Sequence, residues 1–557
     1  MSYRRFRVLL RILPFAAGLC FLSPACEMPI VDTVEQLLDE RLVGVVQLAD
    51  RLDDSVLVAR EALRVRFVVP VAENSILVSG TLPEHGTWSV ESAGPEGVSA
   101  ISLDPPAEGW PVGDRYTLTV GGRSGRRTIE SASFSFSVVG PILHVSPERG
   151  RFLGTGTVER PYNTIGRALE VATANYESDT QVEIRLAAGV HEIGRAGTPD
   201  EDGITIPSNV ILIGGYSDDF VAHDSADFPT TISSLSTDGH TAVTVVETEI
   251  HHVAIETIPG VPALPLRLVG ISTVQDCTID HDLGNAIVVQ ESAGYSSVSD
   301  CFFQSASSSG VVLVSDAGLR LTDVEIRAAP VQGDVVGIRV SGGLELQRTN
   351  VVLQRAEQSR AIRASPADVV LYDSRLEVGG GGFAWGIDYS GSGSLEELIV
   401  SRSEITVGQG SFTTGIEAYD GTIIIVSSVL DGGNPYDAAA ALEVYDGSLT
   451  LRSNTLSIGS DNTSSVLTID TLSEASVPAW IQNNILFVRG TDGGSLIDTD
   501  TLGSITFENN VLHGAGTDQI VTSSEPDGFP STGYSDIATL EAAVATAGGT
   551  ASGNADI

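Results

Sequence analysis

Charged residues recur at one position of a repeated pattern in the second half of the chain. If the runs that carry them stack as β-strands about 4.8 Å apart, their outward side chains form a single column of charge. Pairs of carboxylates about 5 to 10 Å apart are the groups with which glycosidases protonate, attack or activate water at a sugar linkage. The column consists of Arg339, Arg363, Asp388, Glu417, Glu443, Thr468 and Asp498, and its candidate catalytic residues are Asp388, Glu417 and Glu443.

The elements that would position this column are short β-runs in two alternating patterns. The first pattern recurs every 23 to 30 residues between 276 and 509. Examples are "DCTI" at 276, "DVEI" at 323, "NVVL" at 350 and "NNIL" at 483. The second includes "GIRV" at 337, "GIDY" at 386 and "GIEA" at 415. Because so small a unit cannot bury its apolar side alone, copies must stack. The sequence therefore predicts an all-β protein whose residues 141–557 form a right-handed parallel β-helix of about a dozen coils.

Two other interpretations of the repeat region are weaker. Leucine-rich repeats share the period, and "LTLRSNTL" at 449 matches their signature, but other repeats place Ile, Val, Gly and Ser where that family needs Leu and Asn. A phosphate loop at "GTGTVERPYNTIGRALEVA", residues 154–172, lacks the third glycine, the preceding strand and the acidic partner of such sites.

That same stretch predicts a helix that covers the open end of the stack. Ile165, Ala168, Leu169 and Ala172 fall on one helical face. With "VILIGGYSDDF" at 210, the stretch resembles the entry segment of exported bacterial β-helix domains of the pectate-lyase-like class. The resemblance covers residues 141–557. Domains of this class serve as lyases, hydrolases, adhesins or passive stalks, so the resemblance implies the fold and not one function. It supplies no catalytic motif residue by residue.

Composition excludes some partners and cofactors. All 31 basic residues among the 557 are Arg, and the formal net charge is −41. This balance argues against nucleic acid as a partner and excludes Lys from catalysis. Asp200 and Asp202, with Glu201 between them, are candidate calcium ligands. The alternative is that these acids form a solvated loop. The early histidines lack the ligand spacing of a zinc site and are interpreted as surface or turn residues: His240, His251, His252 and His281.

The N-terminus has the layout of a signal peptide over residues 1–25, with Arg4, Arg5 and Arg7 before an apolar stretch. Ala25 before Cys26 resembles a bacterial lipoprotein signal, which implies acylation of Cys26; Ser23 departs from the usual Leu, and plain cleavage is the alternative. We expect an exported outer-membrane or cell-surface lipoprotein, or else a secreted protein, that contacts membrane only through the lipid.

Two further segments precede the repeat. Residues 26–41 are expected to be a tether. Residues 42–140 alternate in the manner of an antiparallel β-sandwich, and "WPVGDRYTLTVGGRSGRRTIESASFSFSVV" resembles the closing strands of bacterial Ig-like domains. Such modules are usually spacers.

Cysteine and asparagine also recur at fixed repeat positions. Cys277 and Cys301 occupy the same place in "VQDCTI" and "VSDCFF", so we expect a disulfide between adjacent coils. A structural stack that satisfies backbone groups is expected of Asn483, Asn484, Asn509 and Asn510.

The functional hypothesis is a non-catalytic surface binding or adhesion module for glycans or cell-surface polymers. The alternative is a polysaccharide lyase or glycoside hydrolase that uses the acidic column. Turns such as "SGSGS" and "YDGT" are too short to wall in that column. We therefore expect Asp388, Glu417 and Glu443 to be solvent-exposed and to titrate normally.

Overall fold

The structure is a computed structural model that describes residues 46–556 with gaps, the longest at 49–55, 82–87, 104–114, 471–477, 524–531 and 543–549. The predicted signal peptide, Cys26 and the tether lie outside the described residues. The chain divides into two compact units, with the change between Ser137 and Val138. In the part that is described, no helix is both long and apolar enough to cross a membrane.

The first unit contains two small antiparallel sheets of four strands each, with Leu63, Val65, Leu118 and Phe134 buried. One sheet has the order β1 (Val46–Leu48), β3 (Leu63–Val71), β6 (Gly97–Leu103), β5 (Trp88–Gly94). The other has the order β2 (Val56–Val58), β8 (Arg127–Val139), β7 (Arg115–Ser124), β4 (Leu77–Gly80), and a 3-10 turn, Glu73–Ser75, precedes β4. The immunoglobulin-like topology stays a prediction.

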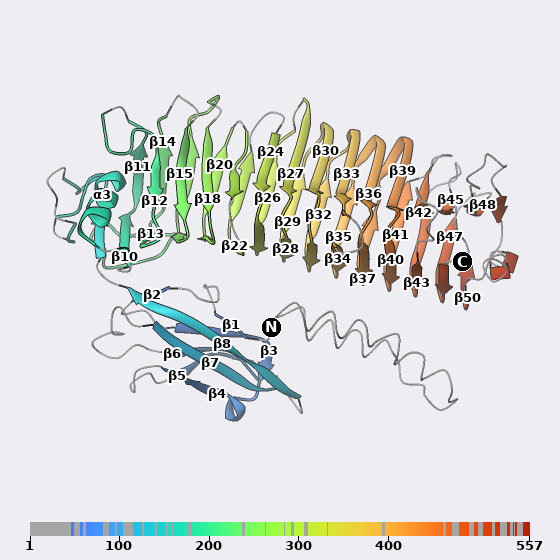
Figure 1. The fold of residues 1–557 in the computed structure, drawn as a ribbon, viewed down its shortest axis with the longest axis horizontal. Helices are drawn as coiled ribbons and strands as arrows, with labels where there is room; N and C mark the ends of the chain where they lie inside the picture. Colours follow the sequence, from blue (N-terminus) through green and yellow to red (C-terminus); the bar gives the residue numbers. More distant parts are fainter. Residues whose placement is uncertain are drawn as a thin grey trace. The chain divides into compact units, whose positions relative to one another are not determined.

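The second unit is the predicted right-handed parallel β-helix (Figure 1), so the fold class is confirmed. Three long sheets run along it because every coil contributes one strand to each. Sheet 1 has 15 strands. They are β9 (Ile142–Val145), β10 (Val182–Ala187), β13 (Val210–Tyr216), β16 (Glu249–His251), β19 (Thr273–Gln275), β22 (Tyr295–Ser299), β25 (Gly318–Thr322), β28 (Leu344–Gln347), β31 (Val369–Tyr372), β34 (Glu397–Ser401), β37 (Thr422–Val426), β40 (Ser448–Arg452), β43 (Ala479–Gln482), β46 (Ile505–Glu508) and β50 (Thr550–Ser552).

Sheet 2 follows sheet 1 in each coil after a tight corner and has 14 strands. They are β11 (Gly189–Ile193), β14 (Thr230–Ser234), β17 (Ala254–Thr257), β20 (Thr278–His281), β23 (Phe302–Ser305), β26 (Glu325–Ala328), β29 (Asn350–Leu353), β32 (Arg375–Val378), β35 (Glu404–Val407), β38 (Val429–Asp431), β41 (Thr455–Gly459), β44 (Ile485–Arg489), β47 (Val511–Gly514) and β51 (Ala555–Asp556).

Sheet 3 also has 14 strands, and it includes the longest ones in the β-helix. They are β12 (Ile204–Ile206), β15 (Thr241–Val246), β18 (Leu264–Val269), β21 (Ile287–Gln290), β24 (Gly310–Ser315), β27 (Asp334–Val340), β30 (Ala356–Ala364), β33 (Gly381–Ser390), β36 (Gln409–Tyr419), β39 (Asn434–Tyr445), β42 (Ser465–Asp470), β45 (Ser495–Thr499), β48 (Gln519–Ser523) and β49 (Thr532–Tyr534). All are parallel except β49, which pairs antiparallel with β48.

Aliphatic side chains of successive coils stack directly on one another inside the β-helix. In sheet 3, for example, one inward position carries an aliphatic residue in coil after coil and is almost completely buried throughout. Each such residue removes apolar surface from water only when the next coil lies over it, so burial and stacking are the same event. The stack runs Ile338, Ile362, Ile387, Ile416, Leu442, Leu467, Ile497.

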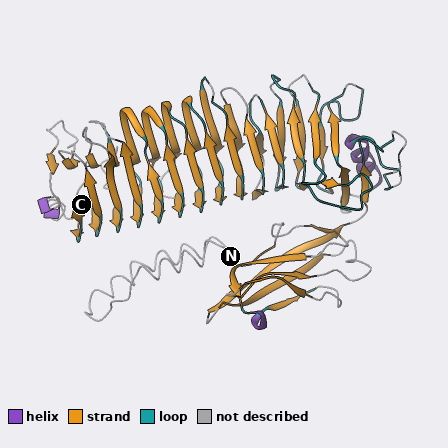
Figure 2. Ribbon diagram, turned by 180° about the vertical axis from the view of Figure 1, so that it is seen from behind, coloured by secondary structure: helices purple, strands orange, loops and turns teal. Residues whose placement is uncertain are grey.

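The predicted capping helix is confirmed as α3 (Ile165–Asn175), the purple helix beside the first coils in Figure 2. Its predicted apolar face, which begins with Ile165 and Ala168, is buried in the core of the β-helix. The Thr164 hydroxyl accepts a hydrogen bond from the Arg167 amide at 3.3 Å and caps the first turn. The glycine-rich stretch therefore closes the end of the stack.

The corner between sheets 1 and 2 is a two-residue turn, and its residue types explain the first sequence pattern. Its first residue has a positive φ, for example 49° at Asp276, 55° at Asp323 and 58° at Asn483. Asp and Asn tolerate this left-handed conformation better than most residues, because their short polar side chains bond locally. The second residue points inward, and in most coils it is polar and joins a ladder along the axis; Val253 and Val324 are apolar exceptions.

Asparagine forms this ladder in the last coils. Asn484 donates its side-chain amide to Leu451 O at 3.1 Å, and its Oδ1 accepts the Asn454 backbone amide at 2.9 Å. Asn484 N donates in turn to Asn510 Oδ1 at 2.9 Å, and Asn554 continues the series. Of the asparagines expected to stack, Asn484 and Asn510 are rungs, whereas Asn483 and Asn509 are the left-handed residues before them. Ser and Thr fill the same position earlier, as at Ser374 and Thr349.

We expect Asn484→Ala to destabilise the last coils by about 2–4 kcal/mol, because it leaves the Asn454 amide and the Leu451 carbonyl buried without partners. Hydrogen exchange of residues 450–512 measures the loss as faster opening of those strands. Thr455→Ala, on the outward side of β41, is the matched control and should leave exchange unchanged. Equal exchange in the two variants would show that the ladder carries no stability.

Candidate functional site

Three outward columns of aromatic and charged side chains run along sheet 3, and the column that contains Arg360, Trp385 and Thr414 separates the phenylalanine column from the charged column. We call this region the aromatic–carboxylate face; it is formed by β30, β33, β36 and β39. The phenylalanine column contains Phe383 and Phe412, and the tyrosine column contains Tyr419 and Tyr445. Between them runs the predicted charged column, in which every pairing is in register: Arg339, Arg363, Asp388, Glu417, Glu443, Thr468, Asp498. The geometric prediction for the candidate acids is therefore confirmed.

Asp388 is the acid that arginines neutralise. Arg360 Nε donates to its Oδ2 at 2.9 Å, and Arg363 Nε lies 3.6 Å from the same oxygen. The Arg360 guanidinium also lies over the Trp385 ring, 4.1 Å from the ring centroid. Since Arg360 and Asp388 are mostly buried, this pair is held more firmly than an exposed salt bridge. Asp388 is thus part of an ion pair with Arg360, and Arg363 lies close by.

The aromatic rings stack in nearly parallel planes from one coil to the next. Phe383 and Phe412 have centroids 5.1 Å apart, and Phe383 and Trp385 have centroids 5.8 Å apart. Tyr419 and Tyr445 form the second stack at 4.7 Å. Phe383 and Phe412 remain 40% and 43% exposed, which is unusual for large apolar side chains. The face thus offers flat apolar surface on both sides of a row of acids.

Glu443 lies in the most perturbed environment of the face. Burial, and next the charge of Glu417 on the preceding coil, raise the pKa of Glu443 to about 7, while a hydrogen bond from Tyr445 opposes the shift. Glu417 in turn accepts a hydrogen bond from the Tyr419 hydroxyl at 2.8 Å. Burial and that bonded carboxylate raise the pKa of Tyr419, so the phenol stays protonated.

The prediction that all three acids are solvent-exposed is wrong, and the prediction of normal titration is wrong for Glu443. Asp388, Glu417 and Glu443 are only partly accessible, and Glu443 holds its proton far above the usual range of a carboxyl group. Long turns are not needed to cover them, because neighbouring coils only about 4.8 Å apart place each side chain against the next one. Tyr419 and Tyr445, two residues further along their strands, bond to Glu417 and Glu443 from the side.

Sequence reasoning missed the aromatic residues of this face. A signal was present, because Tyr419 and Tyr445 each follow a column acid by two residues, in "EAY" and "EVY". Residues two apart on a strand share a face. Phe383, Trp385 and Arg360 lie on the other side of a position where the inward–outward alternation shifts, at Gly386 and Ile387, both buried. Simple counting by two from Asp388 therefore does not reach them.

The calcium candidates are not brought together. Asp200 is buried beside Gly166 of α3, whereas the side chain of Asp202 is 86% exposed and lies 3.8 Å from His240. Among the residues that the structure describes, no group of three or more His, Cys, Asp or Glu side chains is arranged to hold a metal ion. Calcium at this loop stays a prediction.

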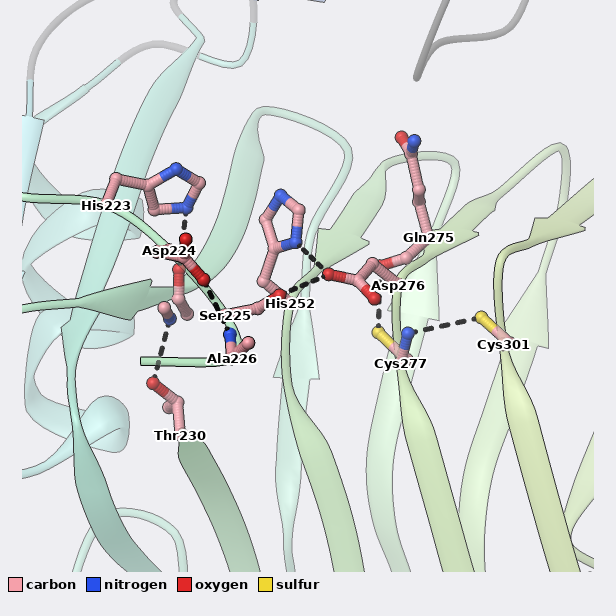
Figure 3. Close-up of polar contacts among 12 residues, drawn as sticks. His223, Asp224, Ser225, Ala226, Thr230, His252, Gln275, Asp276, Cys277 and Cys301 are labelled. Carbon is pink, nitrogen blue, oxygen red and sulfur yellow. Dashed lines mark hydrogen bonds and ion pairs between the residues drawn. The ribbon is translucent and has the colours of Figure 1, made fainter. Parts of the chain in front are cut away.

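The early histidines have separate partners, and the surface-or-turn interpretation is wrong for His251 and His281, which are buried in β16 and β20. His251 Nε2 lies 2.8 Å from Glu249 Oε2, and His252 Nδ1 lies 2.6 Å from Asp276 Oδ2. The Ser225 hydroxyl donates to the same Asp276 oxygen at 2.6 Å (Figure 3). His252 and Ser225 lower the pKa of Asp276, since both bond to its charged form. This network attaches the loop after β13 to the corner of a later coil.

The disulfide expected between Cys277 and Cys301 is absent, and both residues are buried free thiols (Figure 3). They do stack on adjacent coils as predicted, but as rungs of the corner ladder. Cys277 N donates to Cys301 Sγ at 3.3 Å, and the Cys301 thiol donates to Ser299 O at 3.0 Å. In-register side chains leave parallel Cβ atoms about 4.8 Å apart, whereas a disulfide needs them to converge to about 3.8 Å.

Comparison with known proteins gives similarity in fold only. No family model matches the chain, and no curated protein matches it. Among solved structures, the A-module of the Azotobacter vinelandii mannuronan C-5 epimerase AlgE4 has 14% identity and a TM-score of 0.36, over 69% of this chain and 98% of that one. The AlgE6 A-module has 12% identity and a TM-score of 0.33, over 71% and 94%. The Yersinia enterocolitica family 28 exopolygalacturonase has 9% identity and a TM-score of 0.29, over 91% and 98%.

Fold and site together define the class of protein: a parallel β-helix with an aromatic–carboxylate face on its longest strands. Because these similarities are distant, the function has to be argued from the residues of the face.

The pKa of Glu443 predicts a pH-dependent stability. Between pH 4.5, the ordinary pKa of a glutamate, and about 7 the folded protein keeps a proton that the unfolded chain has lost. The stabilisation is complete below this window and is lost as pH rises through it, by at most about 3 kcal/mol in total.

We therefore expect the thermal midpoint of the β-helix to fall between pH 4.5 and 7 in the natural protein and to fall less in Glu443→Gln. Glu404→Gln, at an exposed position of sheet 2, is the control for loss of a carboxylate. Identical pH profiles for the natural protein and Glu443→Gln would contradict the assignment.

Proposed function

We propose that the aromatic–carboxylate face binds a glycan chain. The observation that supports this most is the coexistence of exposed Phe383 and Phe412 rings with a row of carboxylates between two aromatic columns. Sugar rings present apolar C–H faces and polar hydroxyl edges, so a surface that recognises them needs flat apolar groups next to hydrogen-bond acceptors and donors. The face supplies both at a spacing that repeats with each coil.

A second candidate function is cleavage of the bound chain, and the state of Glu443 favours it. A general acid must hold its proton near neutral pH until the leaving oxygen takes it. Glu443 meets this condition, and Glu417, its in-register neighbour, lies one strand spacing away. Carboxyl groups about 5 to 5.5 Å apart suit retention of configuration, with Glu417 as the nucleophile. Burial and like charge thus divide the two acids into different roles.

Retention and cleavage are tested together by incubating the full chain with immobilised polysaccharides and scoring bound protein and newly formed reducing ends. We expect at least one polysaccharide to retain the protein. Phe412→Ala removes the flat ring and should weaken binding about tenfold, which equals a loss of about 1.4 kcal/mol of binding free energy. Phe487→Ala, at an outward position of sheet 2, is the matched control.

The outcome for Glu443→Gln separates the two candidates. Reducing ends that appear with the natural protein and vanish with Glu443→Gln, while retention persists, would establish the cleaving enzyme. If the natural protein and Glu443→Gln are both retained and neither cleaves the polysaccharide, the protein is a binding module. Absence of retention on every polysaccharide, or equal binding by Phe412→Ala, would refute the proposal as a whole.

We also propose that the protein is exported and that Cys26 is acylated, so that the β-helix is displayed at a cell surface. The support is the order of charged, apolar and small residues before Cys26. The expected result is that the natural protein partitions with membranes and that Cys26→Ser moves to the soluble fraction. If both partition alike, acylation at Cys26 is excluded and simple secretion becomes the explanation.

A further inference from the structure

The strands that carry the aromatic–carboxylate face are longer than those on either side. Sheet 3 widens from 7 residues in β27 to 9, 10, 11 and 12 in β30, β33, β36 and β39, and it returns to 6 in β42. The four long strands cover three strand spacings along the axis, about 14 Å, whereas β36 alone extends for about 33 Å in its own direction. The face is therefore longest along the strands.

The groups that can contact a ligand are spread in the same direction. Phe412 and Tyr419 lie on one strand, β36, seven residues and so about 23 Å apart, with Glu417 between them. Each aromatic column, in contrast, consists of two rings on neighbouring coils and extends over one strand spacing, about 4.8 Å, along the axis. A linear chain therefore reaches both aromatic columns when it lies along the strands.

The surface between Phe412 and the acids is low on β36 and β39. The intervening column carries the bulky Trp385 on β33 but the small Thr414 on β36 and Ala440 on β39. Thr414 and Ala440 are buried, so they do not project from the face. A chain can thus pass from the ring to the carboxylates over these two strands.

The connections at both ends of these two strands are very short. Gly408 alone joins β35 to β36, and residues 432–433 join β38 to β39. At the other end, residues 420–421 join β36 to β37, and residues 446–447 join β39 to β40. Connections of one or two residues cannot fold back over the face, so a bound polymer can continue past both of its edges.

We propose that the glycan lies along β36 and β39, across the axis of the β-helix, and that the face takes an internal stretch of a polymer and not a chain end or a disaccharide. This inference rests on the proposed glycan-binding function. A pyranose unit, built from bonds about 1.5 Å long, extends a chain by about 5 Å, so about four or five units cover the distance from Phe412 to Tyr419. Glu417 then meets the chain about 7 Å from the Tyr419 end, with sugar units on both sides of it.

The length of the stretch is tested with fragments of two to eight sugar units prepared from each polysaccharide that retains the full chain. We expect affinity to rise at least about tenfold between two and about five units and then to level off, because a short fragment reaches only one aromatic column. Affinity that is already complete with two units would overturn the inference.

The direction of the chain is tested with Tyr419→Ala and the matched control Asp334→Ala. Tyr419 lies along β36 from Phe412, whereas Asp334 lies three coils away in the register of the phenylalanine column. We expect Tyr419→Ala to weaken binding of fragments of about five units about tenfold, and Asp334→Ala to leave it unchanged. Loss with Asp334→Ala alone would place the chain along the axis and overturn the inference. The thermal midpoint checks folding, and Tyr445→Ala, at the same place on β39, gives a second reading should Tyr419→Ala fold poorly.

Recognition of an internal stretch is tested by partial hydrolysis of a retained polysaccharide into shorter chains that still exceed the binding stretch. This treatment multiplies the chain ends but keeps the mass. We expect the amount of protein bound at saturation per mass of polysaccharide to stay constant. An increase in proportion to the number of ends would show end recognition and overturn the inference while the glycan face stands. If no polysaccharide retains the protein, it is the proposed function that fails.

Discussion

In-register stacking at a single strand spacing is the constraint on which everything else in the β-helix depends. Ile387 is buried only because Ile362 and Ile416 lie directly below and above it. The same geometry obliges any outward residue that recurs with the period to meet its own kind about 4.8 Å away. In the interior this stacking stabilises the fold, since aliphatic side chains pack on aliphatic side chains. On the exterior it is unfavourable where the stacked residues carry the same charge, since they repel one another.

The aromatic–carboxylate face follows from that constraint. Three acids in successive coils would repel one another, and each is relieved in a different way. Asp388 pairs with Arg360, Glu417 accepts a hydrogen bond from Tyr419, and Glu443 retains its proton. A single column of identical chemistry is thereby divided into an ion pair, a bonded carboxylate and a carboxylic acid, which is the differentiation that acid–base chemistry requires.

Much of the fold could be predicted from the sequence, because the two patterns record the stacking directly. The "D-x-x-aliphatic" pattern marks a left-handed corner, a ladder residue, an outward residue and an inward one, and Asp276 to Ile279 shows all four. The register of the charged column followed from the same alignment.

What could not be predicted depends on contacts across columns. Counting residues does not show that Tyr419 bonds Glu417, that Arg360 reaches Asp388 from a neighbouring column, or that parallel Cβ vectors keep Cys277 and Cys301 from bonding. The pKa of Glu443 is a property of its surroundings and not of its place in a repeat.

The antiparallel strand β49 has a consequence for how such a protein can change in size. The described strands of sheet 3 before β49 pair parallel with one another, but β49 runs antiparallel to β48, so a further coil wound in the same sense would meet an antiparallel partner in this sheet. Lengthening by duplicated coils is therefore favoured in the interior of the array, where each new coil would find parallel neighbours on both sides in all three sheets.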